Sequence, residues 1–123
     1  MKGNVLLVDD EPAILTALSY LVSSAGYDTR TATDGATALA AVDDFTPRVA
    51  VLDVMMPGMD GFELAEQLRA KEGLSDVRII FLTARGSQED RYNGYRSGGE
   101  VYLTKPFDND ELLEVLADVL SFG

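Results

Sequence analysis

The sequence contains no histidine and no cysteine. A His/Cys zinc site, a Ser-His-Asp triad and a cysteine nucleophile are therefore excluded. The chain also has no apolar run near the ~18 residues of a membrane-spanning helix and no charged-then-apolar leader, so we expect a cytoplasmic protein without a membrane anchor. Any chemistry must use carboxylates, hydroxyls, lysines and backbone amides.

Basic residues are scarce. The chain has 10 Lys and Arg against 21 Asp and Glu, for a net charge of −11. This excess of acid argues against direct binding to nucleic acid or to an anionic membrane. The 46% of hydrophobic and 25% of charged residues are typical of a globular domain. We expect residues 1–123 to form a single domain that needs no disulfide or metal to fold.

Short apolar segments alternate with segments of helical periodicity. The predicted strands lie at 5–8, 29–32, 49–52, 79–82 and 101–103. Apolar residues at helical spacing follow each strand, most weakly in the fourth helix, where Asn and Gly lower the helix propensity. Strands that are apolar without alternation predict a parallel sheet covered on both faces. With right-handed crossovers, the expected fold class is a doubly wound α/β domain with five parallel strands in a three-layer sandwich.

Polar side chains stand where these strands end. Asp9 and Asp10 follow the first strand, Asp53 ends the third, Thr83 ends the fourth and Lys105 follows the fifth. Ligands of such sheets bind beyond the carboxyl ends of the strands, so we expect all five side chains at one rim. Clustered carboxylates repel unless a pKa rises or a divalent cation is held.

This set of residues favours one kind of chemistry. Oxygen ligands with few protein carboxylates favour Mg²⁺ that retains water. Together with Mg²⁺, the Lys105 ammonium and the Thr83 hydroxyl suit the oxygens of a phosphoryl group in transfer. The natural nucleophile is then a carboxylate, and Asp53 sits centrally among these residues at the end of its strand.

Each residue also has an ordinary structural interpretation. Asp10 alone fits equally well as a helix N-cap, whereas Asp9 has no capping role in this interpretation. Thr83 alone is an ordinary strand-end residue, and Lys105 alone is an exposed charge. Asp60 is interpreted as a turn and helix-start residue.

Four segments resemble a known family, in order and at matching spacings. They are VDDEP at 8–12, LDVMMPGMDG at 52–61, LTA at 82–84 and YLTKPF at 102–107. Over residues 4–120 the chain resembles the receiver domain of response regulators, the phosphorylated partners in two-component signalling. The resemblance implies a flavodoxin-like fold with strand order 2-1-3-4-5.

The resemblance also implies a phosphorelay role. Asp53 would accept a phosphoryl group from a phosphohistidine on a sensor histidine kinase or a histidine phosphotransfer protein. Mg²⁺ would be bound by Asp10 directly, by Asp9 largely through water, by Asp53 and by the backbone carbonyl of Met55. The chain would catalyse only its own aspartyl phosphorylation and dephosphorylation, and it would not be an enzyme that turns over a metabolite.

The switch residues follow from the same resemblance. Lys105, the Thr83 hydroxyl and the Ala84 amide would contact the phosphoryl group. Thr83 and Tyr102 would form the switch pair, and the bond between Lys105 and Pro106 would be cis. Phosphorylation would then shift the face formed by the fourth helix, fifth strand and fifth helix, which controls a partner protein or an output domain.

Three features depart from the common pattern of the family. The segment 98–101 replaces a frequent Gly-Ala-Asp-Asp, and Met55 and Arg85 occupy positions that tune phosphoryl lifetime. After Lys105 the chain has five acidic residues and no basic one. Receivers of the winged-helix transcription-factor group dimerise through charge pairs that need bases on the last helix. We expect a monomer or a phosphorylation-dependent dimer, with that charge-paired mode disfavoured.

Other functions fit the residues less well. A phosphohydrolase with an aspartyl-phosphate intermediate resembles this pattern, but it needs a second Asp two positions after the nucleophile, where Met55 stands. Intact Asp53 and Lys105 argue against a degenerate receiver that acts only as a scaffold. A flavin-binding electron carrier would need a Ser/Thr/Gly-rich phosphate loop after the first strand, which is lacking.

Overall fold

The computed structural model describes residues 3–84 and 101–121 and confirms the α/β fold. Five parallel strands form one sheet in the predicted order β2-β1-β3-β4-β5. The elements are β1 (Asn4–Val8), α1 (Pro12–Ser24), β2 (Asp28–Ala32), α2 (Gly35–Ala41), β3 (Val49–Asp53), α3 (Gly61–Arg69), β4 (Arg78–Ala84), β5 (Val101–Lys105) and α5 (Asn109–Ser121). The fourth predicted helix and Arg85 lie outside the described residues. None of the described helices has the length and apolarity that crossing a membrane requires.

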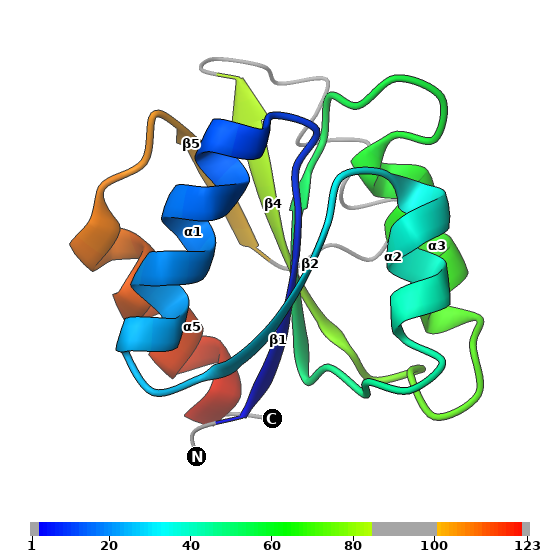
Figure 1. The fold of residues 1–123 in the computed structure, drawn as a ribbon. Helices are drawn as coiled ribbons and strands as arrows, with labels where there is room; N and C mark the ends of the chain where they lie inside the picture. Colours follow the sequence, from blue (N-terminus) through cyan, green and yellow to red (C-terminus); the bar gives the residue numbers. More distant parts are fainter. Residues whose placement is uncertain (1–2, 85–100, 122–123) are drawn as a thin grey trace.

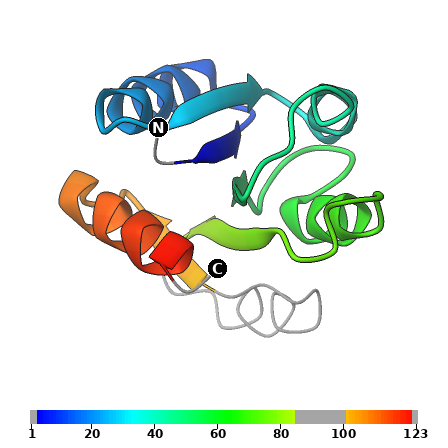
Figure 2. The same ribbon diagram turned by 90° about the horizontal axis from the view of Figure 1, so that it is seen from below.

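The sheet lies between two layers of helices (Figures 1 and 2). α1 and α5 cover one face, and α2 and α3 cover the other. The strands supply alternate residues to two separate hydrophobic clusters, one on each face. On the α2 and α3 face these include Leu6, Val8, Ala50, Leu52, Ile79 and Phe81; on the α1 and α5 face they include Val5, Leu7, Val49, Val51, Ile80 and Leu82. Burial of both faces explains why the strands read as continuous apolar runs.

The last two strands of the sheet order, β4 and β5, extend beyond their apolar segments. β4 ends at Ala84, so Thr83 is its penultimate residue. β5 ends at Lys105, which therefore belongs to the strand and does not follow it as predicted. Pairing of Thr83 with Thr104 and of Ala84 with Lys105 extends the ladder. The pairing uses backbone groups, so it continues past the point where the side chains become polar.

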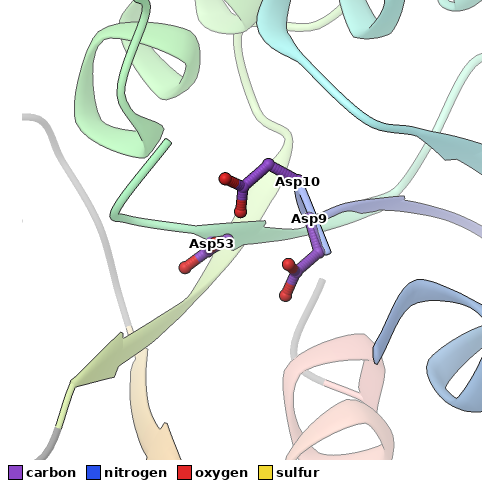
Figure 3. A group of neighbouring side chains, drawn as sticks. All are labelled: Asp9, Asp10 and Asp53. Atoms are coloured by element: carbon purple, nitrogen blue, oxygen red, sulfur yellow. The ribbon is translucent and has the colours of Figure 1, made fainter. Parts of the chain in front are cut away.

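The start of α1 also differs from the prediction. Glu11, and not Asp10, is the N-cap residue, and within the described residues its side chain makes no capping hydrogen bond. Instead, the Glu11 backbone N–H donates to Asp9 Oδ1 at 2.9 Å. Asp9 therefore has the local role at the helix start that the sequence interpretation denied it. Asp10 has no capping contact and lies beside Asp53 (Figure 3).

The other helix starts follow the expected chemistry. Asp34 caps α2 by accepting the Thr37 backbone N–H at 2.7 Å. Asp60 caps α3 in a capping box with Glu63, which confirms its interpretation as a helix-start residue. Both caps lie in loops that follow a strand at its carboxyl end, so they help to fix the loops around the functional edge of the sheet.

Gly61 brings α3 into close contact with the end of β3. A Cβ atom on Gly61 would lie 2.5 Å from the Asp53 carbonyl oxygen and 2.9 Å from Val54 Cα. Backbone atoms cannot move aside as a flexible side chain can. We expect Gly61→Ala to displace the end of β3 at Asp53. It should lower the free energy of unfolding by about 1–3 kcal/mol, which urea denaturation measures.

Gly35→Ala is the matched control for this prediction. Gly35 also begins its helix, but an added Cβ there would meet the flexible Met59 side chain, with Sδ at 2.6 Å. The thioether end can rotate away, so this variant should be destabilised less than Gly61→Ala. Equal destabilisation of the two variants would contradict the close-approach argument.

Candidate functional site

The fold brings the predicted site residues to one edge of the sheet. Asp53 is the last residue of β3, and Asp9 and Asp10 follow β1, which is its neighbour in the sheet. Thr83 and Lys105 lie at the ends of β4 and β5 on the other side of β3. The parallel arrangement makes all these strand ends meet at the same edge, as the sequence argument requires.

Asp9, Asp10 and Asp53 form a compact acidic cluster (Figure 3). One carboxylate oxygen of each lies within 4.8 Å of those of the other two. Asp9 is fully buried, Asp53 is 3% exposed and Asp10 is half-buried. Water therefore screens little of the repulsion between them, and the cluster needs a positive charge or a shared proton.

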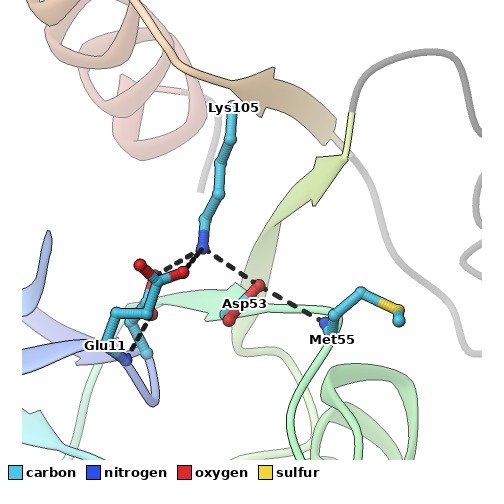
Figure 4. A network of polar contacts seen from close by, with 5 residues as sticks. Glu11, Asp53, Met55 and Lys105 are labelled. Carbon is cyan, nitrogen blue, oxygen red and sulfur yellow. Dashed lines mark hydrogen bonds and ion pairs between the residues drawn. The ribbon is translucent and has the colours of Figure 1, made fainter.

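Lys105 supplies a positive charge. Its Nζ lies 2.9 Å from Asp9 Oδ2, 3.3 Å from Asp53 Oδ1 and 3.9 Å from Glu11 Oε1 (Figure 4). Burial by itself lowers the pKa of the ammonium group. The hydrogen bond to Asp9 and the charges of Asp53 and Asp9 outweigh burial, so the pKa of Lys105 is raised above its usual value. Lys105 remains a cation throughout the physiological pH range.

The Asp53 carboxyl group is close to its titration point at neutral pH. Burial, reinforced by the charge of Asp9, raises its pKa to about 7, against the opposing effect of Lys105. The backbone N–H of Met55 also donates to Asp53 Oδ1 at 3.3 Å. Lys105 therefore offsets only part of the effect of burial and of the Asp9 charge on Asp53. A further positive charge near Asp53 would favour its ionised form.

This raised pKa predicts a pH-dependent effect of Asp53→Asn. The folded pKa is about 7 against an ordinary 3.8, so the stability contributed by the neutral carboxyl is present at low pH and is lost as pH rises toward 7. In the presence of a metal chelator, Asp53→Asn and the wild type should have equal free energies of unfolding near pH 4. At pH 8 the free energy of unfolding of Asp53→Asn should be higher than that of the wild type, by on the order of 2 kcal/mol. Urea denaturation across this range measures it; an advantage that shrinks as pH rises would contradict the raised pKa.

The cluster fits a small divalent cation. Among the described residues, the buried Asp9 Oδ2 has only the Lys105 ammonium as a partner. Three carboxylates face one ammonium, so negative charge remains uncompensated. An all-oxygen donor set of this kind suits Mg²⁺, which keeps several waters and needs few protein ligands. Met55 enters the site through its backbone, since its side chain is 66% exposed.

Comparison with known proteins agrees with this arrangement. A family model described as the response regulator receiver domain matches residues 5–117. The chain belongs to this family. Receiver domains in general bind Mg²⁺ at an acidic pocket, and the carboxylates that could do so here are those of the cluster.

Curated relatives extend beyond the matched region. The DNA-binding dual master transcriptional regulator RpaA of Synechocystis sp. is 40% identical over 109 residues, which is 89% of this chain and 45% of that protein. The transcriptional regulatory protein TcrA of Mycobacterium tuberculosis is 44% identical over 108 residues, 88% of this chain and 42% of that protein. This chain thus spans about half the length of the curated relatives it matches.

Solved structures share the receiver fold almost completely. Chemotaxis protein CheY4 of Vibrio cholerae superposes with a TM-score of 0.91 at 36% identity, covering 95% of this chain and 98% of that one. A putative response regulator from Chloroflexus aurantiacus has a TM-score of 0.90 at 31% identity, with 97% and 98% covered. The predicted family and strand order are therefore confirmed.

The structure gives the positions of the residues that the resemblance assigns to the switch, but not their movement. Thr83 is 2% exposed, and alternation along β4 puts it on the same face as Phe81. Phe81 pairs with Tyr102, and their ring centroids lie 5.5 Å apart. Thr83 and Tyr102 therefore share one face of neighbouring strands. Ala84 ends β4, and the bond between Lys105 and Pro106 is cis, as the resemblance implied.

Glu11 belongs to this receiver site, but the sequence patterns did not single it out. The sequence offered Asp10 as the N-cap with Glu11 in the first helical turn, whereas in the structure Glu11 is itself the N-cap residue and α1 begins at Pro12. The distance of 3.9 Å from Glu11 to Lys105 arises because α1 begins directly after the acidic pair. Three consecutive acids at a strand end were the available signal, and the third was assigned to helix chemistry alone.

Proposed function

We propose that this chain is the phosphoacceptor switch of a two-component phosphorelay and that Asp53 takes the phosphoryl group. One observation carries the proposal. The Asp53 carboxylate lies 3.3 Å from the Lys105 ammonium, within an acidic cluster able to hold a divalent cation. A nucleophile, a charge-stabilising cation and a metal site thus occupy one small region, as phosphoryl transfer requires.

The transfer itself uses few groups of the chain. An Asp53 oxygen attacks the phosphorus of a phosphohistidine, and the new P–O bond forms as the P–N bond breaks. The imidazole leaves and takes up a proton, and Asp53 carries an acyl phosphate. The donor histidine must belong to another protein or domain, because this chain has none.

Other residues hold and neutralise the phosphoryl oxygens. Lys105 is close enough to Asp53 to contact one of them, and the Thr83 hydroxyl and Ala84 N–H would contact others. Asp9, Asp10, Asp53 and the Met55 carbonyl would hold Mg²⁺. The ion would neutralise charge on the phosphoryl oxygens during transfer. The chain would catalyse only its own phosphorylation and hydrolysis.

The proposed partners follow from this role. A sensor histidine kinase or histidine phosphotransfer protein supplies the phosphoryl group in the cytoplasm. A target protein or output domain responds to the face that contains β5 and α5. Direct contact of this acidic chain with nucleic acid is not part of the proposal; DNA binding in a pathway of the RpaA type would belong to another region or protein.

A small-molecule donor tests the proposal without a partner. Incubation with Mg²⁺ and acetyl phosphate should add one phosphoryl mass to the intact protein, and chelation of Mg²⁺ should prevent the gain. Peptide mapping after borohydride reduction should locate the modification at Asp53. An unchanged mass in the presence of Mg²⁺ and donor would contradict the proposed function.

A further inference from the structure

Glu11 is a fourth carboxylate at the mouth of the acidic site. Its side chain is 62% exposed, whereas those of Asp9 and Asp53 are 0% and 5% exposed. Its backbone is fixed, because the Glu11 N–H donates to Asp9 Oδ1 at 2.9 Å. The largely exposed Glu11 carboxylate therefore lies on the solvent side of the buried acids, facing the same Lys105 ammonium (Figure 4).

Glu11 competes for the Lys105 cation. The ammonium contacts Asp9 at 2.9 Å and Asp53 at 3.3 Å, and Glu11 lies further away at 3.9 Å. Within the described residues the Glu11 side chain makes no capping hydrogen bond to α1, so the ion pair with Lys105 is the contact that distinguishes Glu11 from an ordinary exposed acid. An anion that binds Lys105 is therefore repelled by the negative charge of Glu11, which lies 3.9 Å from the same ammonium.

We propose that Glu11 is a specificity-determining residue, which disfavours phosphodonors with an anionic leaving group relative to donors with a P–N bond. The inference rests on the proposed function and names the class of donor that the site selects. With acetyl phosphate, the P–O bond to the acyl group breaks and a carboxylate anion leaves past Glu11. With phosphoramidate or phosphohistidine, the P–N bond breaks and the leaving nitrogen takes up a proton.

Electrostatics gives the sign of the preference. A carboxylate at the mouth repels acetate as it forms, but it does not repel a neutral or protonated amine or imidazole. Because Glu11 is largely exposed, its effect is screened by salt. Glu11 therefore lowers the rate of phosphoryl transfer from metabolic acyl phosphates, and it leaves the rate of transfer from a protein phosphohistidine unchanged.

Two donors and two substitutions test this selectivity. We expect Glu11→Gln to raise the phosphorylation rate with acetyl phosphate roughly threefold and Glu11→Lys roughly tenfold. The rate with phosphoramidate should change by less than about twofold, and the acetyl phosphate gain should shrink in about 0.5 M KCl. Glu114→Gln, which removes an equal charge from the exposed face of α5, should leave both rates unchanged. Intact mass against time gives each rate.

The outcomes separate the possible failures. Equal changes with both donors, or a gain that persists in high salt, would overturn the role of Glu11 in donor selection. An unchanged acetyl phosphate rate in both substitutions would also overturn it. If the wild type accepts a phosphoryl group from neither donor, the proposed function fails and the selectivity fails with it. Circular dichroism of each variant excludes loss of fold as the cause.

Discussion

Replacement of Asp53 with alanine is expected to abolish phosphorylation by acetyl phosphate. The wild type should gain one phosphoryl mass, and Asp53→Ala should gain none under the same conditions. Asp53 is the carboxylate at the end of the central strand β3 that Lys105 contacts at 3.3 Å. Removing it removes the attacking oxygen, which no other group in the site can replace at the same position. Intact mass spectrometry measures the loss.

The control separates the nucleophile from acidity in general. Asp44 is an exposed acid that pairs with Arg30 at 3.1 Å, away from the site. Asp44→Ala removes the same charge and should be phosphorylated at the wild-type rate. If a phosphoryl group still attaches to Asp53→Ala, another acid of the cluster is the acceptor and the assignment is wrong.

Lys105→Met should have the second-largest effect, on rate and stability together. Loss of one preorganised cation in a site of this kind slows transfer by roughly 10²-fold. Asp9 is fully buried and would lose its contact at 2.9 Å, which should lower the free energy of unfolding by about 3 kcal/mol at pH 8. The loss should be smaller at pH 5, because protonation of Asp53 then relieves the repulsion. Urea denaturation and the phosphorylation rate measure the two effects.

Lys71→Met provides the matched comparison. Lys71 pairs with Asp43 on the surface at 3.3 Å, and both side chains are partly or largely exposed. Removing this charge should change stability by less than about 1 kcal/mol and leave the phosphorylation rate unaltered. If Lys105→Met behaved like this surface variant, Lys105 would not be neutralising the buried carboxylates.

Much of the fold was predictable because the strands are buried on both faces. Val49 to Leu52 and Ile79 to Leu82 have no polar residue, and both segments lie in the centre of the sheet. The site residues were predictable for a related reason, since a polar residue directly after such a strand must lie at the sheet edge. The strand order and the individual roles required the family resemblance, because apolar patterns do not encode which strands are neighbours.

The unpredicted features depend on tertiary contacts. Pairing with β4 extends β5 through Lys105, although the apolar run stops at Leu103. The N-cap position of Glu11 depends on where the Asp9 carboxylate lies after β1, which local capping preference does not specify. The close approach of Gly61 to Asp53 depends on the packing of α3 beneath the site. In each case a contact with another residue, distant or adjacent in the sequence, decides the outcome.

The construction of the site has a consequence for folding. Asp9 lies near the start of the chain after β1, and Lys105 lies at the end of β5, so the site joins segments separated by most of the sequence. A contact of such long sequence separation requires the closure of a long loop, which costs entropy before the contact can stabilise the fold. A partly folded chain, in which β5 has not yet joined β4, has Asp53 without its cation. Under the proposed function, the chain would therefore be able to receive the phosphoryl group only after β5 has joined the sheet, and phosphorylation would discriminate against immature chains.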